Sequence, residues 1–379
     1  MAPTERLRVL QVVEAFGGGA LEVVTTISER LAERGDDVAL AYGVRPETPA
    51  DVRARVAPEV ELFPLPWTAR TARAQVGAAR ALRRLVDGWR PDVVHLHSSF
   101  AGLVGAIALR GRVPLIYTPH AYSFTAAQGR VRRTAYRAAE RLVTRLTDVV
   151  GAVSKSEERL AREVARARTV THIPNGIPEL DPGREPGRED DAAGTPSVIA
   201  MGRIVPQRRP EECARILASL DGTADVAWVG GGGPIGPDAP GFRALRDSGV
   251  EVTGWVGRDE AMARLAGATA YLHWTAWDGQ PLSVLEAMAR DVVVVASDIE
   301  ANRELVGDEQ VCAGEADATE LLRAVVSDPD LRERLLRSQR ERRGAHGAQR
   351  MVDRWRELYA AVAAGDTTLA AHKSRQNPL

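Results

Sequence analysis

Short apolar runs alternate with helical segments along most of the chain, and this alternation restricts the fold more than any other feature. Residues 7–13 (LRVLQVV) have the continuous apolar character of a buried strand. Apolar residues then recur at helical spacing from 21 to 31, and residues 38–42 form a second apolar run. A strand, a helix and a strand within about 30 residues match a right-handed βαβ crossover. The same rhythm returns from residue 197 onward, which predicts an α/β protein with parallel sheets.

The alternation falls into two halves, which predicts two doubly wound, Rossmann-like domains. A length of 379 residues is sufficient for two such domains. We assign residues 1–178 to an N-terminal, acceptor-side domain and residues 197–345 to a C-terminal, donor-binding domain. Between them, residues 179–196 are rich in Pro, Gly and charge without an apolar period, which predicts a linker. An amphipathic final helix is predicted over residues 346–364, and a flexible tail over residues 365–379.

Charge and cysteine content argue against several classes of protein. The formal net charge of -1 gives no global reason to expect nucleic-acid binding. Cys213 and Cys312 have no metal-type spacing, which makes a reducing cytoplasm the expected compartment. No apolar run reaches the about 18 residues that a membrane-spanning helix needs, and the N-terminus lacks the pattern of a signal peptide. We therefore expect a cytoplasmic protein.

Two acidic residues, eight positions apart, stand at a predicted loop–helix corner. Asp278 lies in a stretch broken by Gly279 and Pro281, and Glu286 lies in a run that favours helix from Ser283 onward. This pattern puts both carboxylates at the carboxyl end of a parallel sheet, where α/β proteins bind ligands. Glu286 is expected in the first helical turn, near exposed backbone N–H donors. On spacing alone, a helix-capping Asp278 and a solvated Glu286 are the simpler interpretation.

Two further loops are suited to an anionic ligand. Arg203 and Arg208 follow the predicted strand at 197–201, and guanidinium groups at a strand end suit a diphosphate. The glycines at 17–19 lie between a predicted strand and a predicted helix, where backbone amides can approach an anion. On spacing alone, surface arginines and a tight glycine turn are again the simpler alternatives.

Three histidines and a basic helix complete the candidate features. His95 and His97 share one face of a predicted strand, but no carboxylate or Cys completes a metal site, so we prefer a packing or cleft-lining role. His120 follows a strand end at the same sheet edge as the glycine loop. Residues 129–146 carry six arginines. They form either a solvated helix face or a dock for anionic lipid or a phosphate-bearing acceptor.

Five motifs follow one another along the chain: VVEAFGGG, TPHAYSF, IPNGI, GRIVPQRRP and DGQPLSVLEAMA. In sequence and in order they resemble the motifs of retaining glycosyltransferases of family 4. At two positions the chain departs from the family pattern, because Asp278 replaces the usual Glu and Arg208 replaces the usual Lys. Asp278 keeps the charge but shortens its reach by one methylene. The arginine agrees with the chain as a whole, since only Lys155 and Lys373 are lysines among its 50 basic residues.

The resemblance implies the GT-B fold, with two domains facing each other across a cleft and a final helix that crosses back to the first domain. It implies transfer of a sugar, with retention at the anomeric carbon, from a nucleotide diphosphate sugar to an acceptor hydroxyl. A UDP-sugar and a place in bacterial polysaccharide, glycoconjugate or natural-product biosynthesis are favoured. The acceptor would be a small molecule or lipid-linked, in which case the helix at 129–146 would contact the inner face of the membrane. A nucleotide-sugar epimerase of the same fold and an inactive nucleotide-sugar-binding protein are the alternatives.

The same resemblance assigns roles to individual residues. The implied catalytic residues are Arg203, Arg208, Asp278 and His120, with Asp278 and His120 holding sugar hydroxyls. The implied donor-binding residues are Gly18, Gly19, Asn175, Gly202, Asp278, Gly279, Leu282 and Glu286, with Glu286 on the ribose. No side-chain nucleophile, metal ion or cofactor is expected, because arginines and glycine-loop amides would neutralise the leaving diphosphate.

Overall fold

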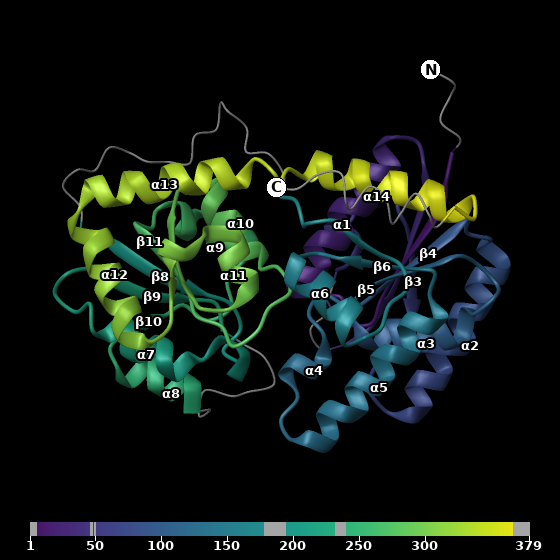
Figure 1. Cartoon of the computed structure of the whole chain (residues 1–379), viewed down its shortest axis with the longest axis horizontal. Helices are drawn as coiled ribbons and strands as arrows, with labels where there is room; N and C mark the ends of the chain where they lie inside the picture. The colour runs from purple at the N-terminus through teal and green to yellow at the C-terminus, as the bar shows by residue number, and fades with distance from the viewer. Residues whose placement is uncertain (1–5, 46–47, 49–50, 178–194, 232–239, 367–379) are drawn as a thin grey trace. The chain divides into compact units, whose positions relative to one another are not determined.

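The computed structural model describes residues 6–45, 48, 51–177, 195–231 and 240–366, and it divides the chain into two compact units (Figure 1). One unit contains Met1–Gly176 and Ala348–Leu379, and the other contains Ile177–Gly347. The predicted linker lies outside the described residues except for its last two positions. The predicted tail lies outside them beyond residue 366.

The first unit is built on a seven-stranded parallel sheet with the order β3-β2-β1-β4-β5-β6-β7. Its strands are β1 Arg8–Val13, β2 Asp37–Gly43, β3 Glu61–Leu65, β4 Val93–His97, β5 Leu115–Thr118, β6 Val149–Ala152 and β7 Val170–His172. Its helices are α1 Gly18–Glu33, α2 Ala72–Trp89, α3 Ser99–Leu109, α4 Ser123–Ala126, α5 Arg130–Leu146, α6 Lys155–Glu163 and α14 Ala348–Ala363, with the 3₁₀ turn η1 Arg53–Arg55. The strand order reverses between β1 and β4, so the crevice for a ligand is expected at their carboxyl ends.

Residues of β4 alternate between the two faces of this sheet, which decides where its histidines lie. Val94 and Leu96 join the apolar core beneath α2 and α3. His95 and His97 point to the opposite face, because successive side chains of a strand alternate. On that face α14 packs against α1 and β4 and brings Tyr359 to His95. The predicted final helix is therefore part of the first unit and lies next to the two histidines.

The second unit is built on a six-stranded parallel sheet with the order β10-β9-β8-β11-β12-β13. Its strands are β8 Ser197–Met201, β9 Asp225–Val229, β10 Glu251–Val252, β11 Ala270–His273, β12 Val293–Ser297 and β13 Val311–Cys312. Its helices are α7 Pro210–Ala218, α8 Pro240–Asp247, α9 Arg258–Ala266, α10 Leu282–Ala289, α11 Glu300–Val306, α12 Glu315–Ser327 and α13 Pro329–Arg343, with the 3₁₀ turns η2 Pro206–Arg208 and η3 Asp308–Gln310. Here the order reverses between β8 and β11, the two strands that lead into the predicted arginine loop and the predicted acidic loop.

The sheets and the helix–strand alternation confirm the prediction of two doubly wound α/β domains. Residues 250–256 (VEVTGWV) also predict a strand, but only the two residues of β10 form one. The cause is Gly254, which has a φ of +72° and pairs with Gly230 in an isolated antiparallel bridge. A left-handed glycine ends an extended strand, and apolar periodicity does not reveal it.

Candidate active site

The loops after β8 and β11 are joined to each other at the switch point of the second sheet. Gln207 in η2 accepts hydrogen bonds on its carbonyl oxygen from the Ala276 amide (2.8 Å) and the Thr275 hydroxyl (3.0 Å). Its side-chain amide donates to the carbonyl oxygen of Trp277 (2.8 Å). Ser297 at the end of β12 holds the same loop, since its hydroxyl donates to the carbonyl of Thr275 (2.7 Å) and accepts from the amide of Thr275 (3.0 Å). The arginine loop and the acidic loop therefore form one bonded corner.

Gly202 begins the arginine loop with a backbone that passes close to a neighbouring strand. Its φ is +125°, a left-handed value that favours glycine. A Cβ placed on Gly230 would lie 2.6 Å from the carbonyl oxygen of Gly202, so the backbones at Gly202 and Gly230 meet without side chains between them. The indole nitrogen of Trp228 donates to the same oxygen at 3.0 Å. This packing sets the direction in which the arginine loop leaves the sheet.

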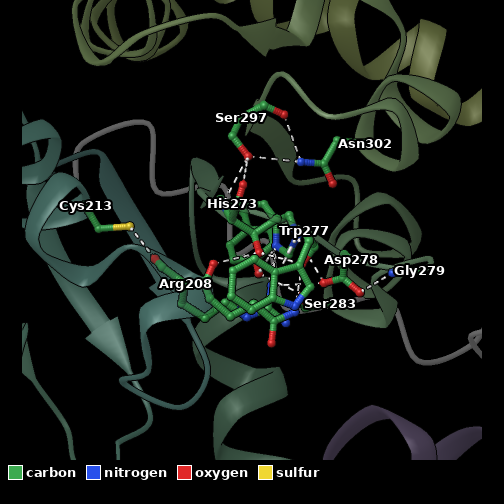
Figure 2. Close-up of polar contacts among 12 residues, drawn as sticks. Arg208, Cys213, His273, Trp277, Asp278, Gly279, Ser283, Ser297 and Asn302 are labelled. Carbon is green, nitrogen blue, oxygen red and sulfur yellow. Dashed lines mark hydrogen bonds and ion pairs between the residues drawn. The ribbon is translucent and has the colours of Figure 1, made fainter. Parts of the chain in front are cut away.

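Arg208 lies at the centre of the corner, against a carboxylate and an imidazole (Figure 2). Its Nη1 is 3.3 Å from Asp278 Oδ2 and 3.2 Å from His273 Nε2. The Tyr271 hydroxyl, which donates to Ser283 Oγ at 2.8 Å, lies 2.9 Å from His273 Nδ1. His273 is therefore protonated on Nδ1 and presents a lone pair on Nε2 to the guanidinium. Burial and the Arg208 charge both lower the pKa of His273 well below 6.5, so the ring is neutral.

Asp278 is held from both sides but keeps one oxygen without a hydrogen bond. Its Oδ1 accepts from the amide of Gly279 at 2.9 Å. Its Oδ2 is buried and, within the described part of the chain, contacts Arg208 and His273 without a hydrogen bond. Burial raises the pKa of the Asp278 carboxyl, while Arg208 and the Gly279 amide act in the lowering direction. The helix-capping alternative for Asp278 is wrong, because Pro281 occupies the N-cap position of α10 and no side chain caps that end.

Arg203 differs from Arg208 in having no polar partner among the described residues, and its side chain is exposed. It precedes η2 on the same loop, so both predicted arginines leave the sheet at one corner. The Arg208 guanidinium is oriented by a carboxylate and an imidazole, whereas the Arg203 guanidinium has no partner among the described residues. Together they supply the forked, permanently charged donors that a diphosphate requires.

Glu286 is placed differently from the prediction. It is the fifth residue of α10, which begins at Leu282, so it lies beyond the first turn and away from the unpaired N–H groups. It is also buried, which rules out a solvated surface position. Its Oε1 lies 2.7 Å from Nη2 of Arg258 at the start of α9. Leu282 packs as a half-buried residue on the apolar core next to it. Arg258, in the segment GWVGRDE, is a site residue that the sequence analysis did not single out.

The remaining predicted site residues lie in the first unit. Gly18 and Gly19 are exposed at the start of α1, and Gly18 has a φ of +60°. Asn175 is buried three residues after β7. Glu14, just before the glycine loop, is buried and forms ion pairs with Arg45 and Arg70.

His120 follows β5 in a backbone conformation that side chains rarely adopt. His120 and Ala121 have φ values of +50° and +82°, which cost non-glycine residues free energy. Glu157 on α6 holds this turn, because its Oε1 accepts from the Ala121 amide and its Oε2 from the Val153 amide, both at 2.8 Å. The half-buried His120 ring lies 2.9 Å from His97 through the nitrogens Nε2 and Nδ1. Burial lowers the pKa of His120 to about 4, so its imidazole is neutral.

His95 and His97 are buried packing residues with hydrogen-bond partners on both ring nitrogens. Among the residues that the structure describes, no three His, Cys, Asp or Glu side chains are grouped to hold a metal ion. Cys213 and Cys312 are both buried free thiols. Across the described ranges, no helix combines the length and the apolar character that crossing a bilayer requires.

All six arginines of α5 are exposed, as both interpretations of this basic helix require. Val131 on the same helix is 84% exposed, so its first turns present an apolar side chain among the charges. In its C-terminal half the helix is anchored by the buried Glu140, which accepts from the hydroxyls of Ser99 (2.5 Å) and Tyr117 (2.8 Å).

Comparison with known proteins agrees with this geometry. The sequence model of Glycosyltransferase Family 4 matches residues 17–179, and that of Glycosyl transferases group 1 matches residues 195–327. The chain belongs to glycosyltransferase family 4. Among curated sequences, this glycosyltransferase is 25% identical over 249 residues to a UDP-Gal:alpha-D-GlcNAc-diphosphoundecaprenol alpha-1,3-galactosyltransferase of Escherichia coli, a match of 60% of the chain. It is 22% identical over 230 residues, 57% of the chain, to a 41.2 kDa protein in the cps region of Klebsiella pneumoniae. Each match spans 63% of the relative, less than two thirds of its length.

Solved structures show the same fold. Sucrose-phosphate synthase from Thermosynechococcus elongatus superposes with a TM-score of 0.80 at 18% identity, over 94% of this chain and 100% of that one. HepE from Anabaena, in complex with UDP and glucose, superposes with a TM-score of 0.75 at 17% identity, over 94% and 100% of the two chains. The family 4 glycosyltransferase described here therefore has the GT-B fold, as the motifs predicted.

Proposed function

We propose that this chain transfers a sugar from a UDP-sugar to an acceptor hydroxyl, with retention at the anomeric carbon, in the assembly of a polysaccharide or glycoconjugate. The observation that carries the proposal is the corner at β8 and β11. There Arg208 is aimed by Asp278 and His273, and the unpaired Arg203 lies on the same loop. A leaving diphosphate develops negative charge, and preorganised positive donors lower the barrier to its departure.

The other site residues take roles that suit their chemistry. Asp278 and His120 bind sugar hydroxyls, and Glu286 binds the ribose after exchanging part of its contact with Arg258 for the ligand. The Gly18 and Gly19 amides and Asn175 contribute further donors. Because the departing diphosphate can itself assist removal of the acceptor proton, the reaction needs no side-chain nucleophile.

Arginines take the place that a metal ion has in many reactions of nucleotide diphosphates. Two guanidinium groups offer forked donors and charge that stays fixed at neutral pH. We therefore expect that treatment with EDTA leaves the rate of transfer unchanged. A rate that falls with EDTA and recovers with Mg²⁺ or Mn²⁺ would show that the arginines are not sufficient.

Two named relatives support UDP as the nucleotide and a lipid-linked acceptor. HepE binds UDP and glucose, and the Escherichia coli relative is named for UDP-Gal and a diphosphoundecaprenol acceptor. The exposed arginines of α5 and the exposed Val131 would suit an anionic membrane surface that carries such an acceptor. We propose peripheral association with the membrane through this helix.

A thermal-shift panel tests the donor first. A ligand that binds only the folded chain raises its Tm, so UDP-sugars are expected to raise Tm more than GDP-sugars. Transfer is then measured with undecaprenyl-diphosphate-linked and soluble acceptors. Arg203→Ala and Glu286→Ala are each expected to abolish transfer while the far-UV circular dichroism spectrum stays unchanged. Wild-type turnover in both variants would refute the site.

The same assays separate the two alternatives. An epimerase would convert the donor sugar without any acceptor, which is visible by chromatography of the nucleotide sugar alone. An inactive binding protein would show the Tm increase but no transfer, and Asp278→Glu would not restore it. Retention is read from the anomeric configuration of the product by NMR.

A further inference from the structure

A chain of buried hydrogen bonds runs through the first unit and ends on His120. Gln11 of β1 lies at its centre, with Nε2 3.1 Å from the Tyr359 hydroxyl of α14 and Oε1 2.7 Å from His97 Nε2. On the far side of His97, Nδ1 is 2.9 Å from His120 Nε2. Gln11, His97 and Tyr359 are all 0% exposed, so their polar atoms depend on one another for hydrogen bonds.

The structure places the nitrogen of the Gln11 amide toward Tyr359 and its oxygen toward His97, and the distances agree with this orientation. With nitrogen toward Tyr359, both contacts are N–H···O bonds inside the usual range of about 2.7–3.2 Å. If oxygen and nitrogen were exchanged, the 3.1 Å contact with Tyr359 would have to be an O–H···O bond. Such bonds usually measure about 2.5–3.0 Å. Gln11 therefore donates to Tyr359 and accepts from His97.

The bond accepted by Gln11 sets the tautomer of both histidines. His97 must carry its proton on Nε2 to donate to Gln11, so Nδ1 of His97 is an acceptor. His120 must then carry its proton on Nε2 to donate to His97, which leaves a lone pair on Nδ1. Within the described residues, Nδ1 of His120 has no hydrogen-bond partner. Burial holds the pKa of His97 well below 6.5, so this ring is neutral as well.

The hydrogen bonds that lead from Tyr359 through His95 to Thr118 are consistent with this assignment of donors and acceptors. Tyr359, having accepted from Gln11, has its own proton to give, and His95 Nδ1 lies 2.8 Å from its oxygen. His95 then carries its proton on Nε2, which is 2.8 Å from Thr118 Oγ1. Every contact from Thr118 to His120 thus has one donor and one acceptor.

We propose that Gln11, His97 and Tyr359 are positioning residues that hold His120 as a neutral hydrogen-bond acceptor, so that this place takes a ligand hydroxyl and not a phosphate oxygen. A hydroxyl can donate to the Nδ1 lone pair, whereas an ionised phosphate oxygen has no proton to donate. The inference rests on the proposed sugar-binding role of His120 and adds the protonation state that makes His120 selective.

The tautomers can be read directly by NMR on the free, full-length protein labelled with ¹⁵N-histidine. Correlating the ring nitrogens with the carbon-bound ring protons distinguishes a protonated nitrogen from an unprotonated one. The signals of His120 are identified by their loss in His120→Asn. Near neutral pH, His97 and His120 are both expected with a proton on Nε2 and none on Nδ1. A proton on Nδ1 of His120 would overturn the proposal.

Tyr359→Phe tests the positioning chain, because it removes the oxygen that accepts from Gln11 and so frees the amide to turn over. His97 and His120 are expected to show a second set of signals with the proton on Nδ1. The matched control is Tyr271→Phe, which removes the hydroxyl of another fully buried tyrosine that contacts a histidine, His273, in the second unit. The control should leave the His97 and His120 signals unchanged. Identical His97 and His120 tautomers in wild type and Tyr359→Phe would contradict the role of Tyr359.

These NMR measurements need no sugar donor and no sugar acceptor. A protein that shows the expected tautomers but transfers no sugar would refute the proposed function and leave intact the assignment of His120 as a neutral acceptor held by Gln11, His97 and Tyr359. A protein that transfers sugar while His120 carries its proton on Nδ1 would refute this inference and leave the proposed function intact.

Discussion

The two units differ in how the buried polar groups at their candidate binding edges are paired: the first edge carries His120, and the second carries Arg208 and Asp278. In the first unit, the hydrogen-bond chain from Thr118 to His120 is neutral, and among the described residues its ring nitrogens are paired except for Nδ1 of His120. In the second unit, Arg208 keeps its charge, and Asp278 retains a buried oxygen without a hydrogen bond. A neutral chain can fix the direction of a hydrogen bond but supplies no charge. An ion pair supplies charge and aims it, which is the requirement of a diphosphate.

The largest effect is expected from removing the oriented charge at the β8–β11 corner of the second unit. Arg208→Ala removes the oriented guanidinium, and transfer should fall by about 10²–10³-fold in kcat/KM, the usual loss for one preorganised donor. Asp278 would lose the cation that lowers its pKa and would take up a proton more readily. Initial rates at varied donor concentration measure the loss.

A neighbouring arginine provides the matched control. Arg209 precedes α7 and lies 3.3 Å from Glu212, away from Asp278. Arg209→Ala removes the same charge one position along the chain and should keep the wild-type rate. Equal losses in Arg208→Ala and Arg209→Ala would mean that general positive charge, and not the aimed guanidinium, drives transfer.

Arg208 and Asp278 also show how far the sequence could lead. Both stand in motifs, and parallel-sheet topology brings the ends of β8 and β11 together, so their proximity was predictable. His273 was not, because a histidine in a buried strand gives no sign of its neighbours. Gln207 was missed for the same reason, since its bonds to the 275–277 loop depend on the turn that η2 makes.

Errors at Glu286 and β10 have a common cause. The helix run was predicted from Ser283, whereas α10 begins at Leu282, which moves Glu286 past the first turn. The strand predicted at 250–256 ends at Val252, two residues before the left-handed Gly254. Apolar periodicity locates an element, but its ends are decided by single backbone angles, which the periodicity does not carry.

A smaller effect is expected from weakening the turn that carries His120 in the first unit. Glu157→Gln leaves one of the two amides at Ala121 and Val153 without an acceptor, because an amide side chain has one acceptor oxygen and not two. The free energy of unfolding should fall by about 1–3 kcal/mol. Transfer should also fall, since the strained turn that carries His120 loses its restraint. Urea unfolding and initial rates measure the two effects.

The next residue on the same helix gives the comparison. Glu158 forms an i,i+4 pair with Arg162 at 2.7 Å. Glu158→Gln should change the free energy of unfolding by less than about 0.5 kcal/mol. If Glu157→Gln were equally mild, the turn at His120 would be held by something other than Glu157.

The smallest expected effect concerns how the buried carboxyl of Glu140 makes stability depend on pH. Burial raises the pKa of Glu140 above 4.5, while Ser99 and Tyr117 act in the lowering direction without a cation. The folded chain therefore keeps this proton to a higher pH than the unfolded chain does. Between the two pKa values the folded state binds more protons, so stability falls as pH rises from 4.5 upward. Glu140→Gln cannot ionise and should not show this decline.

Urea unfolding of wild type and Glu140→Gln between about pH 5 and pH 8 isolates this contribution, because the other titrating groups are common to both proteins. The wild type should lose stability relative to Glu140→Gln as pH rises. Glu163→Gln, at an exposed position on α6, is the control and should run parallel to wild type. A constant difference between wild type and Glu140→Gln would show that the two hydroxyl donors fully offset burial. The contrast between the two edges would then rest on their ligand-facing residues alone.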